Sequence, residues 1–263
     1  MKFQDKVVFI TGGAKGLGKA MTEAFLAEGA SVAVCNRDAE AISKFDEEFK
    51  GKKVLAFAAD ITNYEEMEKV AGKVWDTWGK VDVLINNAGI VNPLVPSEKT
   101  KKENFDRAID VNLKGTFYVS QIFGKRMLEQ KSGRIINIIS QVALYGEKGF
   151  LPYAMSKAGL MVMTRNLASE WSRHGVTVVG IAPGFIAGGM NAGLIRKQVF
   201  VDFLSNKTPI GRMAKVEEIT GLVLFLTSPE AQYINGETIV IDGGMTGYTA
   251  EPLVDFIMAG QGK

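Results

Sequence analysis

The stretch Thr11-Gly12-Gly13-Ala14-Lys15-Gly16-Leu17-Gly18 directly follows a short apolar run at 7–10 and opens a segment of helical period at 17–28. Glycines at such a strand-to-helix turn let the backbone turn tightly. They also let a pyrophosphate approach the N–H groups and the positive dipole end at the start of a helix. The stretch therefore predicts a nucleotide-binding turn, and a strand-to-helix turn without a ligand is the alternative.

The rest of the chain repeats this alternation of strand and helix. Short β-branched runs at 31–34, 53–58, 81–86, 134–139, 176–182 and 238–241 alternate with segments of helical period at 39–49, 64–78, 103–130, 152–174 and 216–228. Runs that are apolar throughout are typical of strands buried on both faces of a parallel sheet. We therefore expect an α/β fold, a doubly wound parallel sheet of about seven strands with helices on both faces.

The domain organisation follows from the absence of a linker or repeat. No change in composition interrupts the alternation, so we expect one domain over residues 1–263. Two segments stand apart from it. The stretch 184–212 carries three glycines followed by an apolar set and is a candidate substrate lid, and a tail at 243–263 follows the last strand.

Composition narrows the possible partners of the 263-residue chain. Its 31 basic and 29 acidic residues are spread evenly, which is unlike the charge footprint of a nucleic-acid binder. A single cysteine, Cys35, and a single histidine, His174, exclude an internal disulfide and argue against a metal site. The N-terminal residues lack a signal-peptide core, and the apolar runs are too short to span a bilayer. We therefore expect a cytoplasmic protein with no metal, membrane or nucleic-acid partner.

Tyr153 and Lys157 lie four residues apart in a segment of helical period, so their side chains project from one face. An ammonium at ~4 Å in an effective dielectric of ~20 would favour the phenolate by at most about 4 kcal/mol, before burial takes some of this back. That effect would bring a tyrosine into the range of acid–base chemistry. The alternative is an ordinary pair of residues on a helix surface.

The chain resembles the short-chain dehydrogenase/reductase family in its classical form. The resemblance covers nearly the whole length and rests on the order and spacing of separate motifs. These are the glycine turn at 11–18, Asn-Asn-Ala-Gly at 86–89, Asn112, Ser140, Tyr-Ala-Met-Ser-Lys at 153–157 and Pro-Gly at 183–184. The resemblance implies a Rossmann-like single domain, hydride transfer to or from a nicotinamide cofactor, and a homotetramer.

The resemblance also implies roles for individual residues. Tyr153 would exchange a proton with the substrate oxygen, and Ser140 would donate a hydrogen bond to that oxygen. Lys157 would bind the nicotinamide ribose and bias Tyr153, and Asn112 would hold a water reaching Lys157. The implied cofactor-binding residues are Gly12, Lys15, Gly16, Leu17, Gly18, Asn36, Arg37, Asp60, Ile61, Asn86, Ala88, Gly89, Tyr153, Lys157, Pro183, Gly184 and Ile186. For Asn86 and Asn87, buried amides that tie strands together are the alternative.

The choice between NADP and NAD depends on charge at the end of the second strand. A carboxylate there would accept from the adenosine ribose and repel a 2′-phosphate. Asn36 occupies that place, Arg37 follows it, and Lys15 stands in the glycine turn, so we expect a preference for NADP(H). Two alternatives keep NAD(H) possible: the two cations could be solvated surface charges, and Asp38 could face the ribose.

The substrate is the least defined part of the prediction. The tail resembles the longer C-terminal ends of bacterial glucose and other sugar dehydrogenases, whereas the expected entrance is mostly apolar. Only Gln141, Glu147, Lys148 and Asn191 offer partners for hydroxyl groups there, and Gly188 stands where the family often has a threonine. We expect an NADP(H)-preferring oxidoreductase acting on a secondary alcohol or ketone, such as a sugar, polyol or related hydroxy compound. The alternatives are a 3-oxoacyl-carrier-protein reductase, a broad-specificity ketone reductase, and a nucleotide-sensing scaffold without enzymatic activity.

Overall fold

Seven parallel strands form one sheet in the computed structural model, which describes residues 2–187 and 198–247. The strands are β1 (Val7–Thr11), β2 (Ser31–Asn36), β3 (Val54–Ala58), β4 (Val83–Asn86), β5 (Gly133–Ile138), β6 (Val176–Pro183) and β7 (Thr238–Ile241). Their order in the sheet is β3-β2-β1-β4-β5-β6-β7, and every neighbouring pair is parallel. The predicted doubly wound parallel sheet is confirmed. Its order reverses between β1 and β4, which is where such sheets open a crevice at the carboxyl ends of their strands.

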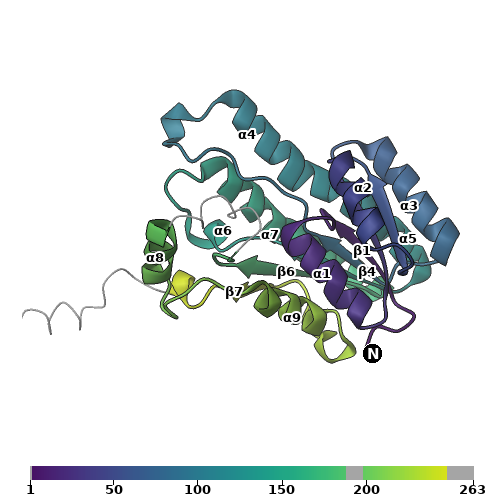
Figure 1. Cartoon of the computed structure of the whole chain (residues 1–263). Helices are drawn as coiled ribbons and strands as arrows, with labels where there is room; N and C mark the ends of the chain where they lie inside the picture. The colour runs from purple at the N-terminus through teal and green to yellow at the C-terminus, as the bar shows by residue number, and fades with distance from the viewer. Residues whose placement is uncertain (1, 188–197, 248–263) are drawn as a thin grey trace, which may run out of the picture.

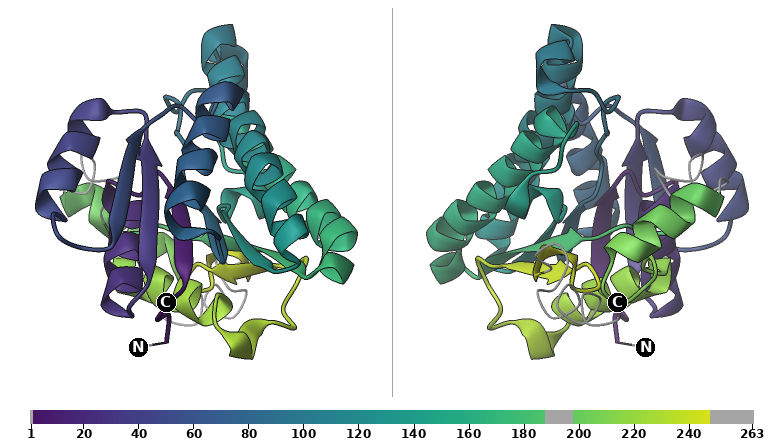
Figure 2. Two further views of the ribbon diagram at one scale, coloured as in Figure 1. Left: turned by 90° about the vertical axis from the view of Figure 1, so that its right-hand side faces the viewer. Right: turned by 90° about the vertical axis from the view of Figure 1, so that its left-hand side faces the viewer.

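Helices cover both faces of this sheet (Figures 1 and 2). On one face pack α1 (Gly16–Ala27), α2 (Ala39–Glu48) and α9 (Val216–Leu226). On the other pack α3 (Tyr64–Trp78), α5 (Thr116–Gln130) and α7 (Leu151–Trp171). Strand β1 shows why both layers are needed, because Phe9 enters one apolar core while Val8 and Ile10 enter the other. Successive side chains of a strand point to opposite faces of the sheet, and both faces are covered by helices, so each residue of β1 is buried.

The helix expected over residues 103–130 has an irregular middle. It consists of α4 (Lys102–Ala108), a π-helical segment (Ile109–Gly115) and α5. A Cβ at Gly115 would lie 2.9 Å from a side-chain carbon of Ile61, so the segment approaches the loop after β3 closely. Such π segments are frequent at functional sites, and this one contains Asn112.

A buried cation closes the amino-terminal edge of the sheet. Arg134, the second residue of β5, is 7% exposed and has no carboxylate among the partners of its guanidinium in the described residues. Its Nε donates to the carbonyl of Leu226 at 2.8 Å, and its Nη1 donates to that of Ile234 at 2.8 Å. Leu226 ends α9, where carbonyl groups lack partners within the helix. Arg134 supplies such a partner, and burial lowers the pKa of its guanidinium to about 10.

The two segments set apart in the sequence fall partly outside the described residues. The candidate lid contributes α8 (Gln198–Lys207), whereas Gly188 and Asn191 lie beyond what the structure describes. Of the tail, only residues 243–247 are described. Within the described ranges no helix is both long and apolar enough to cross a membrane. The same part of the chain contains no group of three or more His, Cys, Asp or Glu side chains arranged to hold a metal ion.

Candidate active site

One cavity of about 1060 Å³ runs along the carboxyl ends of the strands. Most of the predicted site residues line it. They are Gly12, Lys15, Gly16, Leu17, Gly18, Asn36, Arg37, Asp60, Ile61, Ala88, Gly89, Ser140, Tyr153, Lys157, Pro183, Gly184 and Ile186. The structure therefore brings together segments that lie up to 174 positions apart, from Gly12 to Ile186. Two predicted residues, Asn86 and Asn112, do not line the cavity.

The glycine turn fits a bound phosphate. Gly12 and Gly16 adopt positive φ angles of 67° and 51°, which other residues rarely tolerate. A Cβ on Gly18 would lie 2.1 Å from the carbonyl oxygen of Gly12, so only glycine allows the turn to pack against α1. The N-cap residue Lys15 makes no side-chain hydrogen bond to the helix. The first N–H groups of α1 are therefore available to an anion at the cavity.

Asn86 and Asn87 occupy different environments although they are adjacent. The Nδ2 of Asn86 donates to Ser120 Oγ at 2.9 Å and to Asn137 Oδ1 at 2.8 Å, inside the core. This is the strand-tying position raised as the alternative for Asn86. Asn87 lines the cavity, and its Nδ2 donates to the carbonyl of Thr11 at 3.0 Å. Successive side chains of a strand point to opposite faces, so the sequence alone could have predicted that Asn86 and Asn87 lie in different environments at the end of β4.

Two ion pairs occupy the end of the cavity at β2 and β3. Lys15 pairs with Asp38, and Arg37 Nη1 lies 3.7 Å from Asp60 Oδ2. Asp38 also caps α2, because its Oδ1 accepts from the Ala41 N–H at 3.0 Å. The hydrogen bond from Lys15, together with this cap, lowers the pKa of the Asp38 carboxyl. The side chains of Lys15 and Arg37 are 59% and 60% exposed, so each pair contributes little to stability and exchanges partners at low cost.

Ser140, Tyr153 and Lys157 line the other end of the same cavity. The lysine Nζ donates to the carbonyl of Ile138 at 2.7 Å and lies 5.8 Å from the centre of the Tyr153 ring. Burial raises the pKa of Tyr153 to about 12, against a smaller lowering by its hydrogen bond with Ser140. Burial also lowers the pKa of Lys157 to about 8. The sequence argument predicted a lower tyrosine pKa, and this direction was wrong because burial of the phenol dominates the pKa of Tyr153.

Asn112 connects the loop after β4 to the helix that carries Tyr153. Its Oδ1 accepts from the Ile90 N–H at 2.8 Å, and its Nδ2 donates to the Ile90 carbonyl at 2.9 Å and to Ser156 Oγ at 3.0 Å. Ser156 Oγ in turn donates to the carbonyl of Tyr153 at 2.7 Å. Both polar atoms of the Asn112 side chain thus have protein partners, and its role toward a water stays a prediction. Sequence reasoning missed Ser156, although it stands inside the Tyr-Ala-Met-Ser-Lys motif.

The remaining lining residues come from the ends of strands, from loops after strands and from helical segments beside them. Sequence reasoning did not assign them to the cofactor or to catalysis, except that Asp38 was the alternative partner of the ribose and Asn87 belonged to the Asn-Asn-Ala-Gly motif. They are Cys35, Asp38, Ala59, Asn87, Ile90, Val91, Asn92, Pro93, Leu94, Val111, Ile138, Ile139, Gln141, Val142, Phe150, Phe185, Phe200 and Val216. Most of them lie near the carboxyl end of a strand or in a loop that faces that edge, whereas Val111 lies in the π-helical segment, Phe200 in α8 and Val216 at the start of α9.

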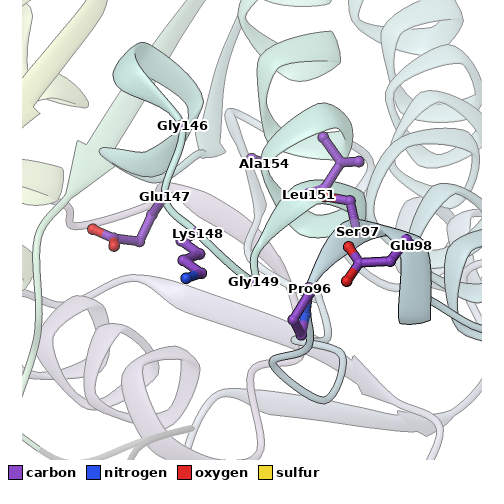
Figure 3. A pocket seen from close by; sticks show the side chains of 9 residues that line it. All are labelled: Pro96, Ser97, Glu98, Gly146, Glu147, Lys148, Gly149, Leu151 and Ala154. Atoms are coloured by element: carbon purple, nitrogen blue, oxygen red, sulfur yellow. The ribbon is translucent and has the colours of Figure 1, made fainter.

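A second, smaller hollow of about 450 Å³ lies between residues 96–98 and 146–151 (Figure 3). Glu147 and Lys148, two of the expected hydroxyl partners, line this hollow and not the larger cavity. Figure 3 shows them on one wall, with Ser97 and Glu98 across from them. A carboxylate oxygen of Glu147 lies 3.8 Å from Lys207 Nζ on α8. The catalytic cavity therefore contains neither of these two charged side chains.

Comparison with known proteins agrees with this arrangement. The family model described as Enoyl-(Acyl carrier protein) reductase matches residues 12–246. The chain is 38% identical over 247 residues to the 3-oxoacyl-[acyl-carrier-protein] reductase of Thermotoga maritima, covering 93% of this chain and 99% of that protein. The chain belongs to the short-chain dehydrogenase/reductase family. The predicted family and fold are confirmed.

Two further relatives extend the comparison. The sorbitol dehydrogenase of Cereibacter sphaeroides is 33% identical over 256 residues, which cover 93% of this chain and 98% of that protein. The crystal structure of a short chain dehydrogenase from Bacillus anthracis superposes with a TM-score of 0.85 at 34% identity, covering 94% of this chain and 99% of the other. This short-chain dehydrogenase/reductase is accordingly an oxidoreductase that acts on CH–OH groups with a nicotinamide cofactor.

The buried Lys157 gives this family member a testable pH dependence of stability. The unfolded chain keeps the lysine proton up to about the ordinary pKa of 10.5, whereas the folded chain loses it near 8. Between these values the unfolded state binds more protons, so stability rises with pH. We expect the free energy of unfolding by urea to rise between pH 8 and 10 in wild type relative to Lys157→Met. The comparison with the variant removes the opposing effect of the buried Cys35 thiol, whose pKa burial raises to about 12. Parallel curves for the two proteins would contradict the assignment.

Proposed function

We propose that the chain transfers hydride between NADP(H) and a secondary alcohol or ketone of a sugar, polyol or related hydroxy compound. The observation that supports this most is the shared cavity. Ser140, Tyr153 and Lys157 line it at one end, and the glycine turn at 12–18 lines it at the other. One ligand with a pyrophosphate and a reactive ring could therefore contact both ends.

The protonation states support roles for the three side chains. With a pKa of about 12, Tyr153 carries its proton at neutral pH and can donate it to a carbonyl oxygen during reduction. Ser140 stabilises charge on the same oxygen by hydrogen bonding. The ammonium of Lys157 would hold the ribose and favour loss of the tyrosine proton. When bound, the nicotinamide supplies or accepts the hydride, so the ketone, NADPH and a proton give the alcohol and NADP⁺.

Removing the phenol hydroxyl tests these roles. In Tyr153→Phe we expect kcat to fall about 10²–10⁴-fold, because the proton donor is lost. The Kd for NADPH should change less than threefold, since the phenol acts on the substrate oxygen. Absorbance of the reduced nicotinamide measures the rate, and fluorescence titration measures binding. The control is Tyr233→Phe, a fully exposed tyrosine outside the cavity, which should leave kcat unchanged. Equal activity of wild type and Tyr153→Phe would refute the proposal.

A preference for NADP(H) is supported by the charges at the end of β2. Asn36 ends the strand without a carboxylate, and Asp38 is occupied by Lys15 and by the cap of α2. The exposed Lys15 and Arg37 can exchange their carboxylate partners for a 2′-phosphate, which offers a higher charge and three acceptor oxygens. NAD(H) remains the alternative cofactor, favoured if Asp38 releases Lys15 and turns toward the ribose.

Two charge changes of opposite direction test the cofactor proposal. Arg37→Asp should shift the ratio of kcat/KM values at least tenfold toward NAD(H), because the new carboxylate repels the 2′-phosphate. Asp38→Asn should shift it toward NADP(H), since asparagine keeps the helix cap but releases Lys15. Lys44→Asp, on the exposed face of α2 and outside the cavity, is the matched control and should leave the ratio of kcat/KM values unchanged. A wild type that prefers NAD(H) would contradict the charge argument.

A 3-oxoacyl thioester is the second candidate substrate. The similarity to an acyl-carrier-protein reductase supports it, as do the apolar residues Val142, Phe150, Phe185 and Phe200 in the cavity lining. The same lining is compatible with a broad-specificity ketone reductase, because apolar pockets discriminate weakly between isosteres.

We also propose that the chain forms a homotetramer. Large apolar side chains are exposed on two separate faces. Met155 and Val162 of α7 are 47% and 58% exposed, and Phe225 of α9 and Val240 of β7 are 47% and 40% exposed. Two such faces suit two different contacts between copies. Light scattering should give four times the 28.6 kDa of one chain, and Val162→Glu should reduce this mass. A wild-type monomer at micromolar concentration would exclude the tetramer.

A further inference from the structure

Ser156 is a buried residue of α7 that stands between Tyr153 and Lys157 in the sequence. Its exposed fraction is 0%, and it is not among the residues that line the catalytic cavity. Its Oγ donates to the carbonyl of Tyr153 at 2.7 Å and accepts from the Nδ2 of Asn112 at 3.0 Å. A hydroxyl that donates to one group and accepts from another can hold the two at a fixed separation. Ser156 therefore joins the first turn of α7 to the π-helical segment that carries Asn112.

The same face of α7 packs closely against the π-helical segment. Gly159 follows Ser156 by three positions and therefore lies on the same face of the helix. A Cβ at Gly159 would lie 2.8 Å from a side-chain carbon of Leu113, so a residue larger than glycine would hold the two segments apart. Ser156 and Asn112 are both fully buried in this contact, where water cannot replace a lost hydrogen-bond partner.

Asn112 extends this connection to the cavity. Its Oδ1 accepts from the Ile90 N–H at 2.8 Å, and its Nδ2 donates to the Ile90 carbonyl at 2.9 Å. Gly89 and Ile90 both line the catalytic cavity. A Cβ at Gly89 would lie 3.2 Å from Asn112 Oδ1 and 3.5 Å from Lys157 Nζ, so the loop lies against both side chains. The contacts form a closed ring that runs from Ser156 through Asn112 and the loop to Lys157, and back along α7.

This ring determines where the side chains of Tyr153 and Lys157 lie relative to the loop 89–90. The two side chains line the cavity from α7, and the loop lines it from the end of β4. The rate of a bond-making step depends steeply on such geometry, and a misplacement of about 1 Å can cost about 10²-fold. Ligand binding depends on many contacts along the cavity and is less sensitive to one of them. A residue that holds the ring closed should therefore influence the rate more than the binding of ligands.

We propose that Ser156 is a positioning residue for the reaction. Its hydroxyl places the first turn of α7, and with it the phenol of Tyr153, relative to the loop 89–90. It acts through Asn112 and the backbone of Tyr153, and it touches neither substrate nor cofactor because it lies outside the cavity. The inference rests on the proposed function, in which Tyr153 is the proton donor, and adds to it a residue behind the cavity wall.

Removing this hydroxyl tests the inference. Ser156→Ala takes away both hydrogen bonds, while Asn112 keeps its two bonds to Ile90, so we expect the variant to fold. We expect kcat to fall at least tenfold, because the proton donor is less precisely placed. The KM of the ketone and the Kd of NADPH should change less than threefold, since no cavity contact is lost. Fluorescence titration with NADPH counts the folded sites, so kcat is expressed per binding site.

Two further variants separate the hydroxyl from packing and from stability. Ser120→Ala is the matched control. Ser120 is fully buried in α5, donates to the carbonyl of Thr116 at 2.8 Å and accepts from the Nδ2 of Asn86 at 2.9 Å, all outside the cavity lining. This variant should keep the wild-type kcat. Ser156→Thr keeps a hydroxyl that can reach a preceding helix carbonyl, and should stay within threefold of the wild-type kcat.

Hydrogen exchange of the protein without ligands gives a readout that does not depend on turnover. The Ile90 N–H should exchange at least tenfold faster in Ser156→Ala than in Ser120→Ala, because the ring is open only in the former. This difference supports the inference even if wild type reduces no ketone, which would refute only the proposed function. A wild-type kcat in Ser156→Ala, alongside an inactive Tyr153→Phe, would overturn the inference and leave the proposed function intact. Equal exchange in the two variants also overturns it, as does a Ser156→Thr as slow as Ser156→Ala, or a Kd of NADPH that rises as much as kcat falls.

Discussion

The joint between the ends of β1 and β4 is the constraint on which the rest of the site depends. Thr11 Oγ1 accepts from the N–H groups of Asn87 and Ala88, both at 3.0 Å, and Asn87 returns a hydrogen bond to the carbonyl of Thr11. These bonds fix two adjacent strands whose connections leave in opposite directions, and the cavity opens between those connections. The glycine turn begins at this joint, and the loop held by Asn112 leaves from it. A shift there would displace both ends of the site together.

Much of the fold follows from local sequence, and the exceptions have non-local causes. The central strands could be predicted because burial on both faces favours apolar, β-branched runs. The edge strands β3 and β7 are only partly buried and could be predicted from their place in the alternation of strands and helices. The π-helical segment could not, since residues 103–130 have one continuous helical period. It depends on the close approach of Gly115 to Ile61 and on the bonds between Asn112 and Ile90, which join segments distant in sequence.

The site also contains residues that local sequence predicts and contacts that it does not. Motif residues such as Gly18 and Tyr153 could be placed because backbone geometry and helix spacing determine where they lie. Partners brought together by the fold could not: the sequence shows Lys15 and Arg37 as two cations, whereas the structure pairs them with Asp38 and Asp60. The pKa of Tyr153 is a further example, because its direction depends on how completely the phenol is buried. The charges near a group and its burial both shift its pKa, and both depend on the folded structure and not on the spacing of residues in the sequence.

Arg134 shows that the amino-terminal and carboxyl ends of the strands have different roles. At the amino-terminal edge, the Arg134 guanidinium donates hydrogen bonds to carbonyl groups of α9 and of the segment after it. These bonds hold α9 and that segment against the sheet. At the opposite edge, amide oxygens stay unpaired and loops meet around a cavity. The side chains that line the cavity are thus not the ones that hold α9 to the sheet. The relatives of the chain include an acyl-carrier-protein reductase and a sorbitol dehydrogenase, so the fold by itself does not determine the substrate.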